Sequence, residues 1–203
     1  MNDIKKLLQN NMQWAIKTTV KNPDFFSSLV KQQNPKYLWI GCADSRVPAN
    51  EIVGLPSGEL FVHRNIANVV IHTDLNALSV IQYAVDVLKV EHIIVCGHYE
   101  CGGITAALSG KEYGLIDQWL RHIKDIAKIY KDELDKYENI QEKANKLSEF
   151  NVIEQVKNIA ESNILHNAWR NNQKIKVHGW IYSLKDGIIH DLGITQDKIN
   201  EDL

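Results

Sequence analysis

The chain has 203 residues, of which 24% are charged, and its formal net charge is −2. This balance gives no general attraction to nucleic acid or to an anionic membrane. Its apolar stretches are too short or too interrupted to span a bilayer, and its N-terminal segment lacks the continuous apolar stretch of a secretion signal. Three cysteines do not make a disulfide scaffold, and their odd number favours a reducing compartment. We therefore expect a cytoplasmic protein without a nucleic-acid or membrane partner.

Residues 1–33 are expected to form a helical arm. The segment "IKKLLQNNMQWAI" has apolar residues at helical spacing, and the Asn22-Pro23 pair ends the predicted helix. Asp24 is a candidate cap for a short second helix. Because a chain of this length fits one compact domain, we expect a single domain over 1–203 that begins with this arm.

Four segments are rich in β-branched, aromatic and other apolar residues and are predicted as strands: "KYLWIG", "ELFVHRN", "EHIIVCGH" and "KIKVHGWIYS". The Asp186-Gly187 turn predicts a hairpin between the last of them and "IIHDL". Between strands, "DLNALSVIQYAVDVLKV" predicts a helix capped by Thr73 or Asp74, and "GGITAAL" predicts another. Two further helical stretches are predicted over 115–147 and 149–171.

Strands that alternate with helices favour an α/β fold. We expect a mainly parallel open sheet with flanking helices, an antiparallel C-terminal edge strand and an N-terminal helical arm. In such sheets, functional sites gather just past the carboxyl ends of the strands. Cys42 follows the first predicted strand and His98 follows the apolar part of the third. Both side chains are therefore expected at the same edge of the sheet.

Two short motifs supply candidate metal ligands. "CADSR" contains Cys42, Asp44 and Arg46, and "HYEC" is an H-x-x-C pair of His98 and Cys101 on a glycine-rich turn. Two thiolates and one imidazole suit zinc far better than magnesium or calcium, and they leave one tetrahedral position for water or a substrate. Asp44 is then either the fourth ligand or a neighbour of the fourth position.

Each of these residues also has a simpler interpretation. Cys42 alone fits a buried cysteine at a strand end, and Asp44 with Arg46 fits a surface ion pair of little energetic value. The cysteine inside the third predicted strand is interpreted as a core residue. A nucleophilic Cys42 with His98 as its base is a further alternative, although it leaves Cys101 without a role. The occurrence of both motifs after two separate strands favours the metal site.

The segments "CADSRV", "HRNIAN" and "GHYECGG" resemble the signature segments of the β-class carbonic anhydrases. The resemblance extends from about residue 30 to "HGWIYSLKDG" near residue 187. It implies an α/β sheet with a helical arm, a homodimer or homotetramer, and an enzyme that interconverts carbon dioxide and bicarbonate with one Zn²⁺ per chain. Carried onto this chain, the zinc ligands are Cys42, His98 and Cys101. Asp44 is then an exchangeable fourth ligand and Arg46 is its ion-pair partner.

The resemblance gives Asp44 two expected roles. Zinc lowers the pKa of bound water from about 15.7 toward about 7, so that hydroxide is available near neutrality. When paired with Arg46, Asp44 would accept a hydrogen bond from this hydroxide and orient it toward carbon dioxide. On the zinc itself, Asp44 would displace the hydroxide and shut the enzyme. The residues implied for the substrate pocket are Gln33, Phe61, Ile66, Tyr83 and Gly102.

A finer resemblance concerns regulation. A type II subgroup of the family has a tryptophan three residues before the first cysteine and is inhibited by bicarbonate at a separate, allosteric site. This chain has Trp39 at that place, and it has Arg64 and Tyr182 at positions resembling those that hold the effector. An arginine fork is a good bidentate partner for a planar oxyanion. The simpler interpretation is that Trp39 is a core residue and Arg64 a structural one.

Two alternatives to carbon dioxide hydration stay open at this point. The same site on the same fold suits a hydrolase of carbon disulfide or carbonyl sulfide, which the motifs do not distinguish. From a different class, a zinc ion closed permanently by Asp44 would make a non-catalytic binding module. Arg46 argues against the module, because a permanent ligand needs no partner to remove it.

Overall fold

The computed structural model describes residues 3–31 and 33–199. These residues fall within two compact units, Met1–Asn34 and Pro35–Leu203. None of the described helices has the length and apolar character that a bilayer span requires. The expectation of a single domain over 1–203 with an arm over 1–33 stays a prediction.

The N-terminal unit consists of two helices, α1 (Asp3–Lys21) and α2 (Phe25–Lys31). α1 ends immediately before the asparagine–proline pair that was expected to stop it. Trp14 packs edge-on against Phe25 and Phe26, with ring centroids 6.4 Å and 5.5 Å away. The apolar side chains of α1 at helical spacing are largely exposed, and they include Leu7, Leu8, Met12 and Ile16.

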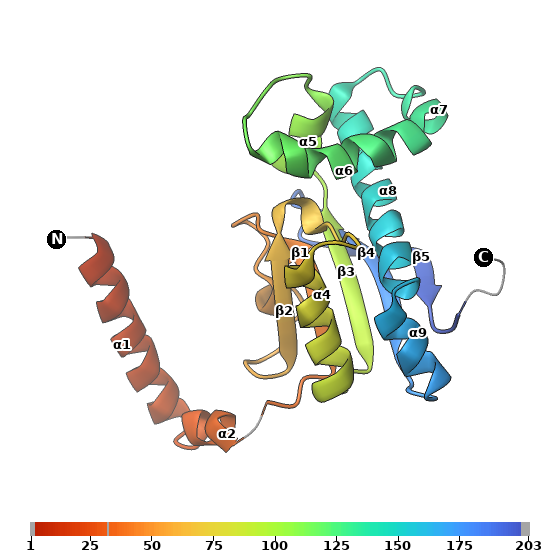
Figure 1. Cartoon of the computed structure of the whole chain (residues 1–203). Helices are drawn as coiled ribbons and strands as arrows, with labels where there is room; N and C mark the ends of the chain where they lie inside the picture. Colours follow the sequence, from red (N-terminus) through yellow and green to blue (C-terminus); the bar gives the residue numbers. More distant parts are fainter. Residues whose placement is uncertain (1–2, 32, 200–203) are drawn as a thin grey trace. The chain divides into compact units, whose positions relative to one another are not determined.

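A five-stranded sheet lies at the centre of the second unit (Figure 1), in the order β2-β1-β3-β4-β5. The strands are β1 (Tyr37–Cys42), β2 (Leu60–Asn65), β3 (His92–His98), β4 (Lys176–Tyr182) and β5 (Ile189–Gln196). β1 to β4 pair in parallel, and β5 pairs antiparallel with β4 after the predicted hairpin turn. The predicted α/β fold with an antiparallel C-terminal edge strand is confirmed.

Helices connect the parallel strands and form three apolar cores with them, the smallest of which lies around Trp39 and Ile94. The bounds of the helices are α3 (Ala49–Ile52), η1 (Ile66–Asn68), α4 (Leu75–Gln82), η2 (Tyr83–Val87), α5 (Gly102–Leu108), α6 (Ile116–Ile129), α7 (Lys131–Leu134), α8 (Ile140–Ala160) and α9 (Asn163–Arg170). The first core packs α4, α8 and α9 against the sheet and includes Leu38, Ile93 and Val177. The second core joins α5, α6 and α8, and it contains both Cys42 and Cys101.

The helical region after α5 is divided differently from the prediction. A break was expected at residue 148, but α8 runs through this position, and the breaks lie at 130, 135–139 and 161–162. Asn139 accepts hydrogen bonds from two backbone N–H groups at the start of α8, and Ser162 caps α9 with one such bond. Ser148 does not end the helix, because its hydroxyl donates to the carbonyl four residues earlier. The predicted boundary was therefore wrong.

Two smaller predictions are confirmed. Asp74 caps α4, since its carboxylate accepts a hydrogen bond from the backbone N–H of Asn76. Cys96 is 1% exposed inside β3, and burial raises the pKa of its thiol. It is a core residue, as its apolar surroundings in the sequence indicate.

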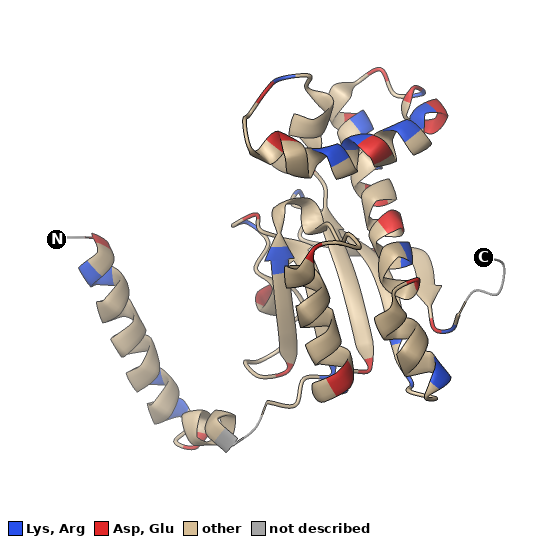
Figure 2. Ribbon diagram, in the orientation of Figure 1, with Lys and Arg blue, Asp and Glu red and all other residues tan. Residues whose placement is uncertain are grey.

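Figure 2 shows basic and acidic residues interspersed along α6, α7 and α8. Lys128 pairs with Asp125 and Lys136 pairs with Glu133, each at 2.7 Å. These side chains are more than half exposed, so each pair contributes little to stability. The charged stretch is a solvated helical surface, as its composition predicts.

A pair of histidines lies at the opposite end of β3 from His98. Nδ1 of His92 and Nε2 of His178 are 3.0 Å apart, and Nδ1 of His178 is 3.0 Å from the hydroxyl oxygen of Thr195. Burial lowers the pKa of His178, and the nearby charge of His92 lowers it further; Asp191 opposes this shift, and Lys176 adds the smallest lowering effect. A lowered pKa in the folded state means that the unfolded chain binds this proton first. The contribution of His178 to the free energy of unfolding is therefore fully present above about pH 6.5 and is lost as the pH falls below this value.

Replacing His178 with Gln is expected to flatten this acid-side loss of stability, because the variant has no imidazole to protonate there. The melting temperature, followed by circular dichroism, should fall less between about pH 7.5 and about pH 5.5 in the variant than in the wild-type protein. His72→Gln is the control, since His72 is exposed and its loss should leave the slope unchanged. Equal slopes for His178→Gln and the wild type would contradict the prediction.

Candidate metal centre

Three side chains from two strand ends converge in the second unit. Cys42 ends β1, His98 ends β3, and Cys101 lies in the turn before α5. Their sulfur and ring-nitrogen atoms all lie within 4.8 Å of one another, and all three residues are buried. β1 and β3 are parallel neighbours, so their carboxyl ends meet at one edge of the sheet. The structure therefore brings together the three residues that the motifs single out.

The donor set fits a zinc ion. Nδ1 of His98 lies 2.9 Å from the backbone carbonyl of Tyr99 and donates its proton there, which leaves the lone pair on Nε2. Nε2 is buried and has no hydrogen-bond partner among the described residues. The sulfurs of Cys42 and Cys101 are 3.9 Å apart. Two zinc–sulfur bonds of about 2.3 Å at a tetrahedral angle would separate them by about 3.8 Å.

Contact between the two thiols shifts their pKa values in opposite directions. Contact with Cys101 lowers the pKa of Cys42, helped by His98 and by the backbone N–H of Ala67, whereas the same contact and burial raise the pKa of Cys101. The Ala67 N–H lies 3.3 Å from the Cys42 sulfur. The pair thus provides one thiolate, and a divalent cation between the sulfurs would stabilise the second.

Asp44 lies beside these three residues and is held by Arg46. The guanidinium donates through Nη2 to Oδ2 at 2.7 Å and through Nε to Oδ1 at 3.0 Å, and the backbone N–H of Arg46 also donates to Oδ1. This fork holds the pKa of Asp44 well below its usual range. Oδ2 is 3.7 Å from Nε2 of His98. In this conformation, Asp44 is paired with Arg46 and one of its oxygens faces the ligand atoms.

The three residues expected at an effector site lie on different strands. Trp39 of β1 is 1% exposed and packs against Trp180, with ring centroids 6.4 Å apart. Tyr182 is half-buried at the end of β4. Arg64 of β2 donates to the backbone carbonyls of Cys42, at 2.8 Å, and of Asp44. Arg64 is thus bound to the loop that carries Asp44, a contact that its place in the sequence does not reveal.

The five residues expected around the substrate divide into three groups. Ile66 precedes Ala67 and packs against Gly103, where an added Cβ would lie 2.7 Å from its Cγ2, so Ile66 and Gly102 are next to the ligand turn. Phe61 and Tyr83 form a separate ring pair, with centroids 5.9 Å apart. Phe61 precedes the carboxyl end of β2 by four positions, about 13 Å along the strand. Gln33 is exposed in the N-terminal unit, and its role stays a prediction.

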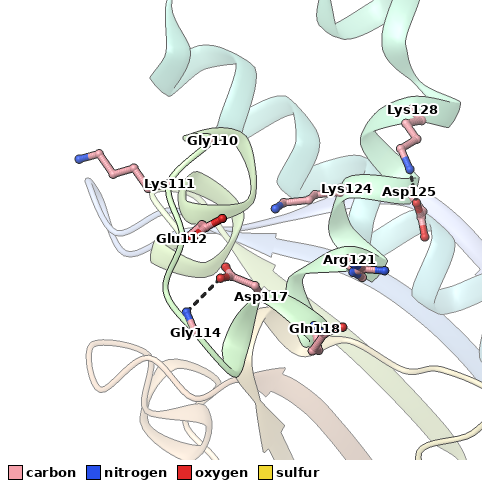
Figure 3. Close-up of a pocket in the computed structure, with 10 residues that line it drawn as sticks. All are labelled: Gly110, Lys111, Glu112, Gly114, Asp117, Gln118, Arg121, Lys124, Asp125 and Lys128. Carbon is pink, nitrogen blue, oxygen red and sulfur yellow. Dashed lines mark hydrogen bonds and ion pairs between the residues drawn. The ribbon is translucent and has the colours of Figure 1, made fainter.

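A groove of about 590 Å³ lies elsewhere, between the loop at 110–114 and α6 (Figure 3). Both basic and acidic side chains line it, and the carboxylate of Asp117 accepts a hydrogen bond from the backbone N–H of Gly114. None of the three candidate ligands lines the groove. Its mixed charge favours no particular class of ligand.

Comparisons with known proteins agree with the geometry. The sequence profile of the carbonic anhydrase family matches residues 37–189. A carbonic anhydrase of Emericella nidulans is 47% identical over 198 residues, which are 98% of this chain and 87% of the relative. A tetrameric β-carbonic anhydrase of Sordaria macrospora has a TM-score of 0.92 at 38% identity, over 97% of this chain and 100% of that one. A Coccomyxa β-carbonic anhydrase in complex with acetazolamide has a TM-score of 0.93 at 35% identity, over 98% of this chain and 90% of that one. The chain belongs to the β class of the carbonic anhydrase family.

Proposed function

We propose that this carbonic anhydrase holds one zinc ion per chain on Cys42, His98 and Cys101 and hydrates carbon dioxide reversibly to bicarbonate and a proton. The observation that supports it most is the convergence of two buried sulfurs and an unpartnered ring nitrogen within 4.8 Å. When bound, zinc supplies a Lewis acid that lowers the pKa of a coordinated water toward about 7. The protein supplies the orientation of the reactants and the control of access.

Asp44 is the orienting group in this proposal. Its carboxylate is fixed at both oxygens by Arg46, and Oδ2 faces the ligand atoms. From there it accepts a hydrogen bond from the attacking oxygen and directs the oxygen's free lone pair toward the carbon of carbon dioxide. Arg46 also donates to the carbonyl of Glu100, at 3.3 Å, which ties the pair to the turn between His98 and Cys101.

Asp44 is also the gate. Without the guanidinium, its carboxylate would be free to turn toward Cys42, His98 and Cys101, where it would exclude water from a bound zinc ion. Because Arg46 is mostly exposed, solvent and salt compete for its contacts, and the carboxylate exchanges between two partners. The enzyme is active in the paired arrangement and inactive in the other.

Bicarbonate inhibition, typical of the type II subgroup, is the regulatory part of the proposal. Arg64 donates to the carbonyls of both Cys42 and Asp44. A planar oxyanion that binds this guanidinium competes with the two backbone contacts and releases the loop that carries Asp44. The effector thereby binds one state of the loop better than the other, which is the condition for a shift in population. Trp39 and Tyr182 supply further donors.

Trp39→Phe is expected to weaken this inhibition, because it removes the indole N–H and keeps an aromatic ring. The bicarbonate concentration that halves the initial rate should rise by about 10-fold or more, as expected for the loss of a hydrogen bond to an anion, which is worth about 1.5 kcal/mol or more. Trp180→Phe is the matched control, since Trp180 packs against Trp39 but belongs to no proposed site. Equal inhibition of both variants and the wild type would contradict an effector role of Trp39.

A second copy of the chain would complete the substrate pocket. Phe61 and Tyr83 lie away from the ligand atoms of their own chain, on the edge strand β2 and beside it. Tyr83 is 43% exposed. In a homodimer or homotetramer, this ring pair would lie near the metal ligands of a neighbouring chain. Phe61 and Tyr83 would then line the substrate pocket of that neighbour, as the resemblance implies. Sedimentation of the purified protein tests whether it is oligomeric.

The proposed function as a whole is tested by two measurements on one preparation. We expect one zinc per chain by elemental analysis and carbon dioxide hydration by stopped flow with a pH indicator. Carbon disulfide and carbonyl sulfide serve as comparison substrates. Stoichiometric zinc without hydration at neutral and alkaline pH would point instead to a non-catalytic module, and absence of zinc would refute the whole proposal.

A further inference from the structure

We infer that Trp119 is a positioning residue for the metal centre, which it affects through the peptide group between Ile66 and Ala67. The inference rests on the proposed zinc site. The indole Nε1–H of Trp119 in α6 donates to the carbonyl of Ile66 at 2.9 Å. The N–H of the same peptide group, on Ala67, donates to the sulfur of Cys42 at 3.3 Å.

These two contacts are coupled, because both are made to the same rigid peptide group. A trans peptide is planar, and its C=O and N–H bonds point in opposite directions. Trp119 therefore orients the N–H toward Cys42 when it holds the carbonyl. A carbonyl that accepts a hydrogen bond also polarises its own N–H, which strengthens the bond to sulfur.

The segment that carries this peptide is held by side chains instead of by a strand or a long helix. Ala67 has a φ of 63° and Asn68 a φ of 48°, both in the left-handed region. On the far side of Ala67, its carbonyl accepts from Nδ2 of Asn151, which is 1% exposed in α8. Both peptide groups that flank Ala67 are thus fixed from outside the segment. Figure 1 shows α6 and α8 approaching the end of the sheet where β2 finishes.

The consequence concerns the charge of the Cys42 sulfur. An amide N–H draws electron density from a thiolate, so the sulfur donates less to a bound ion and the ion stays more acidic. Contacts outside the ligand set commonly tune a metal in this way. Without the indole N–H, the peptide is free to turn and the sulfur becomes a stronger donor.

Trp119→Phe tests the inference, because it removes one N–H and keeps the ring. Trp169→Phe is the matched control: its indole donates to the carbonyl of Ile175 at 3.0 Å, the same kind of bond away from the ligands. In the cobalt-loaded proteins, we expect the sulfur-to-cobalt charge-transfer band of Trp119→Phe to move to longer wavelength. The band of Trp169→Phe should stay at the wild-type position.

A second measurement tests the hydrogen bond to sulfur directly, first in the wild-type protein and then in both variants. In the wild-type protein loaded with cadmium-113, the Ala67 amide proton should show a scalar coupling to cadmium across the hydrogen bond to sulfur. This coupling should be lost or reduced in Trp119→Phe and kept in Trp169→Phe. Absence of the coupling in the wild type, or identical bands and couplings in both variants, would overturn the inference alone. A wild-type protein that takes up neither ion overturns the proposed function and the inference with it.

Discussion

Cys101→Ala is expected to abolish zinc binding and carbon dioxide hydration together. Cys101 provides one of the three converging ligand atoms and lies 3.9 Å from the sulfur of Cys42. Loss of an outer contact of a metal site already costs about 10- to 100-fold, so loss of a ligand should lower the hydration rate by more than about 100-fold. Zinc content after dialysis and stopped-flow hydration measure the two effects on the same sample.

Cys96→Ala is the control for this experiment. Cys96 is as deeply buried as Cys101, but it lies inside β3 away from the ligand atoms. The Cys96→Ala protein should keep both its zinc and its hydration activity. A Cys101→Ala protein that retains stoichiometric zinc would show that the ion is held elsewhere.

Arg46→Ala is expected to lower hydration by about 10- to 100-fold while the zinc content stays at the wild-type level. The variant removes the fork that holds both oxygens of Asp44, so the carboxylate is free to occupy the open ligand position. Stopped-flow hydration and elemental analysis separate the loss of activity from a loss of metal.

Arg46→Lys sharpens the interpretation of this result. Lysine keeps the positive charge but cannot form the two parallel bonds of a guanidinium, so its rate should lie between those of the alanine variant and the wild type. If Arg46→Ala kept the full rate, Asp44 would have no gating role, and water would reach the zinc without the Arg46 contact. If it lost the metal as well, Arg46 would be a structural residue.

The parts of the site that sequence predicts are those encoded by local patterns. Cys42 and His98 each follow an apolar run that reads as a parallel strand, and adjacent parallel strands end at the same edge. The alternation of strands and helices and a short hairpin turn were enough to predict a mainly parallel sheet with an antiparallel edge strand, whereas the strand order β2-β1-β3-β4-β5 comes from the structure. The helix boundaries around α8 were mispredicted, because the two predicted stretches met at residue 148 and did not use the caps Asn139 and Ser162.

The contacts that surround the ligands could not be predicted from the sequence. Trp119 meets the carbonyl of Ile66 across 53 positions of sequence, and Asn151 meets Ala67 across 84. No periodicity or motif encodes such pairs. The left-handed conformation of Ala67 is equally hidden, since alanine is not a residue that favours positive φ. The position of Arg64 against the Asp44 loop likewise follows only from the register of β1 and β2.

The place of the two ligand cysteines in an apolar core has a consequence for how the enzyme matures. Cys42 and Cys101 belong to the same cluster as Leu120, Ile123 and Leu147, so burial of that cluster draws the sulfurs together before any ion arrives. Small zinc modules, in contrast, are unfolded until metal binds. We therefore expect the metal-free chain to fold first and to take up its ion afterwards.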